Sequence, residues 1–263
     1  MTRTVAGAVL LAAGRGARLK PYTNTTPKPL LPINGKPTLD LYFESLASAG
    51  VADAVLVTHH LGELVERYAL QVPELYDIKC TTVPQPSLNG TASALECVIN
   101  YGNTETDVTS NFRDGACENA TRETVNRVLG SSFLLMATDY LIPANFIDDL
   151  LSFHSSHKAD VSISLKRVPQ AELASRSSVR FGDDGQILEI VEKPKAGMAP
   201  SDLAANLAFV LPAKVCSYIE AVEVSARGER EVQSAINHYL AHGGSARGLI
   251  QDTPDEWSPE RNL

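Results

Sequence analysis

Residues 10–32, LLAAGRGARLKPYTNTTPKPLLP, join an apolar run to glycines and basic side chains. Gly14 and Gly16 would let backbone N–H groups come close to an anion, because neither carries a Cβ. Arg18 offers a guanidinium that can bind phosphate through two parallel hydrogen bonds. The segment is not a P-loop, since no Gly-Lys-Ser/Thr follows, and it lacks the third glycine of the dinucleotide fingerprint. On residue types alone it is either a tight turn or a phosphate-binding loop.

The composition limits the partners that such a loop could serve. The chain has 263 residues, of which 44% are hydrophobic and 21% charged, and its net charge is −8. An acidic chain without an apolar stretch of ~20 residues favours neither nucleic acid nor a membrane, so we expect a small anionic ligand. The N-terminal run is too short to favour a signal peptide. Because the four cysteines form no CxxC pair, we expect reduced thiols and a cytoplasmic location.

Strand-like and helix-like segments alternate along the chain. Strands are expected at 5–12, 52–60, 77–85, 131–141 and 159–168, and helices at 38–49, 61–70, 91–101 and 143–157. This alternation predicts an α/β fold, a three-layer, doubly wound, mostly parallel mixed sheet. In such sheets ligands bind at the carboxyl ends of the strands. The glycine-rich loop, Gln85 and Asp139 all fall at such ends.

Two segments interrupt the alternation. Residues 102–128 are polar and weakly periodic, so we expect an inserted loop with one short helix, either a surface excursion or a lid or subunit contact. Residues 176–193 read as strand, DDG turn and strand, which predicts a small antiparallel hairpin. A further strand at 205–212 and a helix at 229–244 follow. Without a linker between them, these elements predict a single domain over residues 1–263.

The wider pattern gives the opening segment a more specific meaning. Residues 10–37 resemble the opening motif of the nucleotidyltransferases that make nucleoside-diphosphate sugars, with Ala17 where that family usually has Thr. The resemblance continues in QPSLNGTASAL (85–95), LLMATDYL (134–141), VEKP (191–194), RGEREVQSAINHYLAHG (227–243) and, more weakly, DEWSPERNL (255–263). It implies the Rossmann-like nucleotidyltransferase fold and attack of an acceptor phosphate oxygen on the α-phosphorus of a nucleoside triphosphate, with release of pyrophosphate. Because that oxygen is already anionic, the protein must supply positioning and electrostatic stabilisation.

The resemblance also assigns residues to the nucleotide, in the half of the chain that spans 1–141. The implied nucleotide-binding residues are Ala12, Ala13, Gly14, Gly16, Gln85, Gly90 and Thr91. The amides of Gly14 and Gly16 would hold the triphosphate, and the Gln85 segment would read the base edge. Of the implied catalytic residues, Arg18 would bind the leaving phosphates and Lys28 would neutralise charge near the reacting centre.

The acceptor half, residues 142–263, carries the remaining assignments. Lys193, the third implied catalytic residue, would grip the acceptor phosphate, while Glu192 would contact acceptor hydroxyls and Asn206 would face the acceptor pocket. NLAFVL (206–211) stands where the sugar enzymes often have Asn-Ala-Gly-Ile/Leu-Tyr, which weakens the assignment of a hexose.

A divalent cation, Mg²⁺, is the implied cofactor. Asp139 would hold it through an oxygen, as a hard cation requires, with Asp255 as the partner carboxylate. The alternative for Asp139 is an N-cap of the helix that follows. His59 and His60 lack a third ligand nearby, so we expect them to be structural.

Several functions stay open on the sequence alone. The leading one is a sugar-1-phosphate nucleotidyltransferase, whose partners are a nucleoside triphosphate and a small phosphorylated acceptor. The alternative is a cytidylyltransferase for phosphocholine, an inositol phosphate or a phosphonate, and a non-catalytic nucleotide-binding subunit comes third. The pattern does not fix the base as uracil, thymine or cytosine, and a homo-oligomer is left open.

Overall fold

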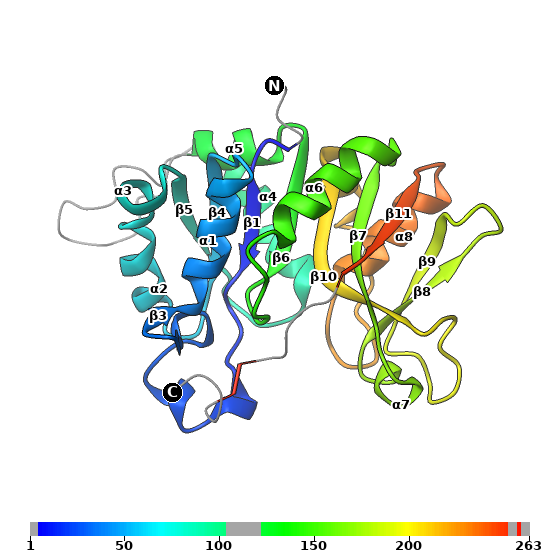
Figure 1. The fold of residues 1–263 in the computed structure, drawn as a ribbon, viewed down its shortest axis with the longest axis horizontal. Helices are drawn as coiled ribbons and strands as arrows, with labels where there is room; N and C mark the ends of the chain where they lie inside the picture. The colour runs from blue at the N-terminus through cyan, green and yellow to red at the C-terminus, as the bar shows by residue number, and fades with distance from the viewer. Residues whose placement is uncertain (1–4, 104–121, 252–256, 259–263) are drawn as a thin grey trace.

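The computed structural model describes residues 5–103, 122–251 and 257–258, and at its centre lies a nine-stranded sheet (Figure 1). Its strands are β1 (Ala8–Leu11), β4 (Asp53–Thr58), β5 (Lys79–Pro84), β6 (Ser132–Ala137), β7 (Val161–Arg167), β8 (Ser177–Phe181), β9 (Ile187–Glu192), β10 (Leu203–Pro212) and β11 (Ala246–Ile250). The main path follows the order β11-β7-β10-β6-β1-β4-β5, and the β8–β9 hairpin branches from β10. Strands β5, β4, β1 and β6 are parallel, whereas β10 is antiparallel to β6 and β7. The predicted mostly parallel mixed sheet and its antiparallel hairpin are confirmed.

Helices cover both faces of the sheet and so make three layers (Figure 1). One face carries α1 (Thr38–Ser48), α2 (Gly62–Ala69), α3 (Val72–Tyr76) and α6 (Phe146–His157), and the other carries α4 (Thr91–Asn103), α5 (Arg122–Leu129) and α8 (Val232–Ala241). Successive side chains of a strand serve opposite faces. In β1, Val9 packs in the core under α4 and α8, whereas Ala8 and Leu10 pack in the core under α1 and α6. Burial on both faces explains why this strand is a continuous apolar run in the sequence.

Short elements fill the connections between these layers. Residues 12–31, which we call the signature loop, contain η1 (Ala17–Leu19), η2 (Tyr22–Asn24) and η3 (Lys28–Leu30). The other short elements are β2 (Pro32–Ile33), its partner β3 (Lys36–Pro37), α7 (Gln170–Leu173) and η4 (Ala213–Tyr218). Within the described ranges, no helix combines the length and the apolar character that crossing a bilayer requires.

The segment expected as an inserted loop, residues 102–128, is in part a packed helix. Helix α4 continues to Asn103, residues 104–121 lie outside the described residues, and α5 begins at Arg122. Val125 and Val128 of α5 are buried in the core, which the polar sequence RETVNRVL conceals. Arg127 of the same helix donates from Nε and Nη2 to Oδ1 of buried Asp53, at 3.0 and 2.8 Å. The end of this segment therefore belongs to the body of the fold.

The Gln85 loop, residues 85–91, is docked against the segment before α8. Arg230 N donates to Asn89 O at 2.8 Å, and Ala92 N donates to Arg230 O at 2.9 Å. Gly90, between them, has φ +109°, and a Cβ added there would lie 2.2 Å from Arg230 O. Only a glycine allows the two backbones to approach so closely. The Gln85 loop is thereby tied to the C-terminal half of the chain.

The short described piece near the C-terminus contacts both the signature loop and β2, which follows it. Trp257 is buried, its Nε1–H donates to Pro32 O at 2.8 Å, and its ring meets the Tyr22 ring edge-on at 5.7 Å. Asp255, the predicted partner carboxylate, falls within residues 252–256 and so lies outside the described residues.

The Arg127–Asp53 pair generates a stability prediction. Replacing Arg127 with Met keeps the aliphatic stem but leaves the buried Asp53 carboxylate without its cation. We expect the free energy of unfolding to fall by about 2 kcal/mol in urea titrations, because an unpaired buried charge is costly. Glu123→Gln is the control, since it removes only a 77% exposed partner of Arg127 and should cost under ~0.5 kcal/mol. Equal losses in both variants would contradict the importance of the Asp53 contact.

The contact at Gly90 generates a second prediction. Gly90→Ala should destabilise the protein by roughly 2 kcal/mol or more, because the new methyl collides with backbone rather than with a side chain that can move. The control is Gly50→Ala, where φ is +72° but nothing lies within 4 Å of the added Cβ, so only the backbone cost of about 1 kcal/mol remains. Thermal unfolding of both variants measures the difference. A Gly90→Ala protein that is as stable as the Gly50→Ala protein would contradict the prediction.

Candidate nucleotide-binding site

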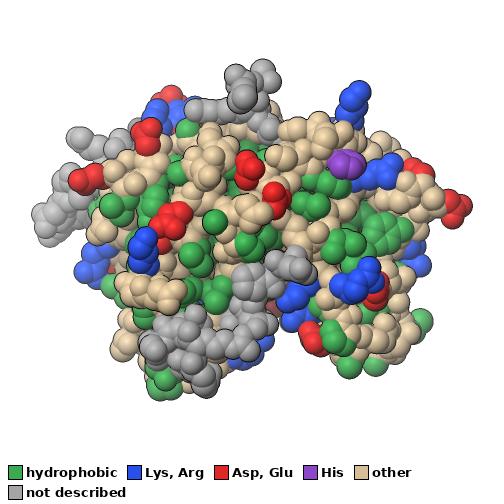
Figure 2. Space-filling model, in the orientation of Figure 1, with side chains coloured by type: hydrophobic (Ala, Val, Ile, Leu, Met, Phe, Trp, Pro, Cys, Tyr) green, Lys and Arg blue, Asp and Glu red, His purple; other side chains and the backbone are tan. Residues whose placement is uncertain are grey.

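A pocket of about 410 Å³ opens at the carboxyl ends of the central strands. The predicted residues that line it are Ala12, Ala13, Gly14, Gly16, Arg18, Lys28, Gln85, Gly90, Thr91 and Asp139. In the space-filling view, the lower edge of the molecule is hollowed between the side that carries the signature loop and the side that carries β8, β9 and α7 (Figure 2). Parallel pairing explains the convergence, because Leu11 of β1 lies beside Val57 of β4 and Ala137 of β6, so these strands end together.

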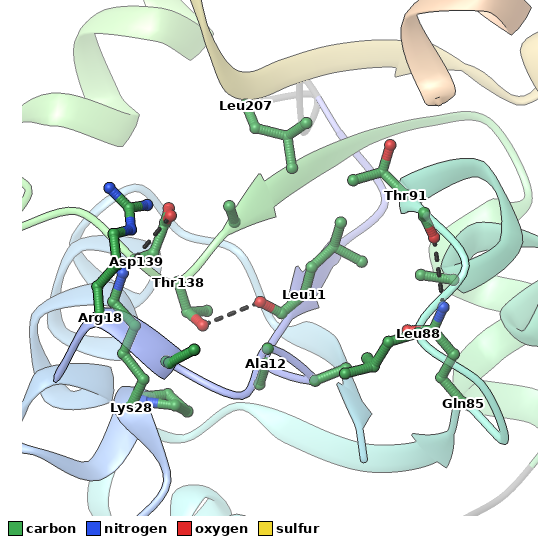
Figure 3. A pocket seen from close by; sticks show the side chains of 18 of the residues that line it. Leu11, Ala12, Arg18, Lys28, Gln85, Leu88, Thr91, Thr138, Asp139 and Leu207 are labelled. Atoms are coloured by element: carbon green, nitrogen blue, oxygen red, sulfur yellow. Dashed lines mark hydrogen bonds and ion pairs between the residues drawn. The ribbon is translucent and has the colours of Figure 1, made fainter. Parts of the chain in front are cut away.

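Opposite charges gather at one end of the pocket, where Arg18, Lys28 and Asp139 lie together (Figure 3). Lys28 Nζ is 3.6 Å from Asp139 Oδ2, and the lysine side chain is only 14% exposed. The other carboxylate oxygen, Oδ1, is buried and has no hydrogen-bond partner among the described residues. Thr138 fixes the strand end, since its Oγ1–H donates to Leu11 O at 2.9 Å. The carboxylate is thus held in place, with one buried oxygen that has no hydrogen-bond partner among the described residues.

Tyr42 holds the backbone just beyond Asp139. Its hydroxyl donates to Tyr140 O at 2.8 Å and accepts from Tyr140 N at 3.2 Å. Burial raises the pKa of Tyr42 well above its ordinary value, so the hydroxyl stays a donor. The expected alternative for Asp139, a helix N-cap, does not apply, because α6 begins only at Phe146, after Asn145.

The opposite end of the pocket is formed by the Gln85 loop (Figure 3). Gln85 is 3% exposed, and its Nε2 donates to Gly90 O at 3.3 Å and to Asn89 Oδ1 at 3.4 Å. Leu88 lines the same end and is 38% exposed. The loop thus presents a polar backbone next to an uncovered apolar side chain.

A chain of polar contacts joins this loop to the predicted acceptor residues. Thr91 Oγ1 donates to Glu231 Oε2 at 3.1 Å and accepts from Val232 N at 2.9 Å. Arg227 Nη2 lies 3.0 Å from Glu231 Oε1 and 3.4 Å from Glu192 Oε1. Burial first, and then the Glu192 charge, raise the pKa of Glu231. One guanidinium therefore bridges two carboxylates that repel each other.

The predicted acceptor residues lie outside the lining of the pocket. Lys193 has φ +44°, a strained backbone for a non-glycine residue, and its Nζ is 3.7 Å from Glu192 Oε1. Asn206 is buried, and its Nδ2 donates to Ser164 Oγ at 3.0 Å. The neighbouring Leu207 lines the pocket instead, reaching over it from β10 (Figure 3). The acceptor roles of Glu192, Lys193 and Asn206 stay predictions.

Sequence reasoning missed several residues of this region. Leu207 and Glu229 line the pocket, and Arg227 and Glu231 connect it to Glu192. All four belong to segments that the motifs had already marked, NLAFVL and RGEREVQSAI. These four residues could therefore have been found only through the motifs that contain them, since no single residue type indicated a role.

The donor set at Asp139 fits a magnesium ion that takes most of its ligands from substrate. The described residues contain no group of three or more His, Cys, Asp or Glu side chains placed to hold a metal. Mg²⁺ commonly binds through one or two carboxylates together with substrate phosphates and water. The unpartnered buried Oδ1 of Asp139 beside the pocket suits that mode. His59 and His60 are engaged elsewhere: their ring nitrogens meet the carbonyls of Gln85 and Thr23.

Comparisons with known proteins agree with this arrangement. The family model described as "Nucleotidyl transferase" matches residues 7–258. A low-salt glycan biosynthesis nucleotidyltransferase (Agl11) from Haloferax volcanii is 27% identical over 89% of this chain, which spans 57% of that protein's length. A UTP–glucose-1-phosphate uridylyltransferase (AglF) from the same organism is 28% identical over 90% of this chain and 84% of its own length. A glucose-1-phosphate thymidylyltransferase from Streptomyces griseus is 25% identical over 92% of this chain, and 59% of its own length is covered.

A solved structure shows the same fold. A UDP-glucose pyrophosphorylase crystallised with UDP-glucose superposes with a TM-score of 0.74, covering 95% of this chain and 92% of its own, at 18% identity. The family match extends over nearly all of the chain and includes every element that builds the pocket. The chain therefore belongs to the nucleotidyl transferase family, as the motifs from the signature loop to α8 predicted.

Proposed function

We propose that this protein transfers a nucleoside monophosphate from a nucleoside triphosphate to a sugar 1-phosphate, releasing pyrophosphate and forming a nucleoside-diphosphate sugar. One observation carries the proposal. Arg18, Lys28 and Asp139 converge at one end of a pocket whose other end is the Gln85 loop, so that charges for phosphates and a platform for a base share one cavity. Relatives named as uridylyl- and thymidylyltransferases of glucose 1-phosphate support the sugar 1-phosphate as the acceptor class.

At the charged end, the chain's own residues bind and orient the triphosphate. The amides of Gly14 and Gly16 face the phosphates, and Arg18 holds the β- and γ-phosphates that leave as pyrophosphate. Lys28, which is largely shielded from water, neutralises charge as the α-phosphorus is attacked. The acceptor oxygen is already anionic, so no group in the pocket has to remove a proton from it.

At the other end, the Gln85 loop binds the base. The backbone at Gly90 and the carboxamide of Gln85 offer hydrogen bonds to a base edge, and exposed Leu88 offers an apolar contact to its face. Thr91 supports the loop through Glu231 rather than touching the base itself. Ala12 and Ala13 keep the floor of the pocket free of bulk.

The acceptor enters from the side of β10 and the β8–β9 hairpin. Lys193 grips its phosphate, Glu192 contacts its hydroxyls, and Asn206 is retained as a prediction of the family pattern. Because β10 lies between β6 and β7, one continuous sheet joins the nucleotide half, residues 1–141, to the acceptor half, residues 142–263. This continuity supports treating the chain as one nucleotidyltransferase domain.

Asp139 holds the divalent cation in this proposal, with Asp255 as its proposed partner. When bound, Mg²⁺ would supply positive charge that offsets the negative charge of the phosphates. Lys28 lies beside the same carboxylate, so its ammonium would add positive charge at the same end of the pocket.

A screen of pyrophosphate release tests the function. UTP, dTTP, CTP, ATP and GTP are each paired with hexose 1-phosphates, phosphocholine, an inositol phosphate and an aminoalkylphosphonate. We expect turnover with UTP or dTTP and a hexose 1-phosphate. Turnover only with CTP and a non-sugar acceptor would replace the proposal with the cytidylyltransferase alternative, and triphosphate binding without turnover of any pair would favour a non-catalytic subunit.

Lys28→Met tests the charged end of the pocket with the best substrate pair. We expect kcat to fall about a hundredfold or more, because a charge that stabilises the transition state is lost. Lys20→Met is the matched control, since Lys20 belongs to the same loop but is exposed and outside the pocket lining. It should stay within about twofold of the parent. A Lys28→Met enzyme with unchanged kcat would contradict the assignment.

The metal assignment is tested by Asp139→Asn and by chelation. EDTA should abolish pyrophosphate release, and added Mg²⁺ should restore it. In Asp139→Asn, the Mg²⁺ concentration for half-maximal rate should rise by about tenfold or more, because a neutral amide is a weaker ligand for a hard cation. Asp148→Asn, an exposed change on α6, should leave that concentration unchanged. An unaltered Mg²⁺ dependence in Asp139→Asn would exclude Asp139 as the ligand.

A further inference from the structure

Two adjacent histidines after β4 connect the two ends of the pocket. His59 Nδ1 lies 2.7 Å from Gln85 O, and His60 Nε2 lies 2.9 Å from Thr23 O. A carbonyl oxygen can only accept, so each of these ring nitrogens must carry the proton of its hydrogen bond. His59 therefore uses Nδ1–H and His60 uses Nε2–H, one toward the base-binding loop and one toward the signature loop.

The His60 contact reaches the phosphate-binding glycines in two steps. Thr23, whose carbonyl accepts from His60, is 1% exposed and donates from Oγ1 to Gly16 O at 2.9 Å. Its methyl also lies 2.7 Å from the place of an added Cβ on Gly16, so the two residues are in close contact. Gly16 lines the pocket. A shift at His60 would therefore move the backbone that we assign to the triphosphate.

The His59 contact fixes the Gln85 loop at its first residue. Gln85 N donates to Thr58 O at 2.8 Å, while Gln85 O accepts from His59. Both backbone groups of Gln85 are thus held by consecutive residues at the end of β4. The Gln85 side chain then holds Gly90 O across the loop. The position of the base-binding loop depends on His59 in the same way as that of the signature loop depends on His60.

We propose that His59 and His60 are positioning residues that set the placement of the phosphate-binding signature loop relative to the base-binding Gln85 loop. This inference rests on the proposed function, because that function assigns the triphosphate to the signature loop and the base to the Gln85 loop. His60 governs how well any triphosphate is held. His59 governs how well one base is distinguished from another. Neither residue lines the pocket itself.

Replacing each histidine with asparagine and with glutamine tests the position of the hydrogen-bond donor, because both replacements remove the imidazole ring but place an amide N–H differently. The Asn amide nitrogen lies near the position of Nδ1, and the Gln amide nitrogen lies near that of Nε2. His59→Asn and His60→Gln thus keep each donor, whereas His59→Gln and His60→Asn displace it. Each position receives both replacements, so the effect of moving the donor is separated from the effect of losing the ring, and kinetics then separates a positioning role from a loss of stability alone.

Steady-state kinetics with the best acceptor gives the first readout. We expect His60→Asn to raise KM about tenfold for every accepted triphosphate, with kcat little changed, and His60→Gln to stay within about twofold of the parent. We expect His59→Gln to change the ratio of kcat/KM between the two best triphosphates about fivefold, and His59→Asn to preserve it. Kinetics that do not distinguish donor-keeping from donor-displacing variants would overturn the inference.

Hydrogen–deuterium exchange without nucleotide gives a readout that does not need activity. Residues 16–24 should exchange faster in His60→Asn than in His60→Gln, and residues 85–91 faster in His59→Gln than in His59→Asn. Thermal unfolding checks that all four variants fold. If the parent protein turned over no substrate pair, the proposed function would fail. Hydrogen–deuterium exchange would still show whether His59 and His60 position the two loops. If the parent were active and exchange showed no such crossover, the inference would be overturned and the function would stand.

Discussion

The ion pair between Lys28 and Asp139 is the contact on which the site depends, because it joins the signature loop to the end of β6 at 3.6 Å. The pair forms because β1 and β6 are parallel neighbours, so the chain leaving β1 and the chain leaving β6 meet at one edge. Lys28 is largely shielded from water, and an unpaired ammonium there would be costly. The Asp139 carboxylate offsets that cost through Oδ2, while its Oδ1 has no hydrogen-bond partner among the described residues. The two opposite charges therefore stabilise each other at this end of the pocket.

The end of the pocket that the Gln85 loop forms is built on a different constraint, the close approach of two backbones. Gly90 and Arg230 meet in a contact that leaves no room for a side chain, and Thr91 is hydrogen-bonded to Glu231, the residue after Arg230. Arg227 then connects Glu231 to Glu192. Glu192 contacts this guanidinium directly, and the Gln85 loop is linked to it through Thr91 and Glu231, so a charge placed at either end would alter the electrostatics of the other. The two halves of the chain are therefore coupled by charge as well as by the continuous sheet.

The accuracy of the sequence predictions follows from burial. Strands β1 and β4 were predictable because both of their faces are covered, so that AVLL and DAVLVT are apolar runs. Strand β11, with the sequence ARGLI at the edge of the sheet, carries an Arg and a Gly and was not expected. A short helix was expected within residues 102–128, but the packing of α5 into the core was not, since RETVNRVL has few apolar side chains. Pocket residues at strand ends were found through the motif, whereas Leu207 depends on a local irregularity of β10 that spacing does not reveal.

That irregularity bears on which β10 side chain lines the pocket. Neighbouring side chains of a strand point to opposite faces. Leu207 packs with the core under α4 and α8, whereas Ala208 packs with the core under α1 and α6. Asn206 is engaged with Ser164, a buried residue of β7. Of these β10 residues, Leu207 lines the pocket, whereas Asn206 and Ala208 do not. The side chain that β10 places in the pocket lining is therefore apolar, and the nearby polar groups Glu192 and Arg227 belong to other elements.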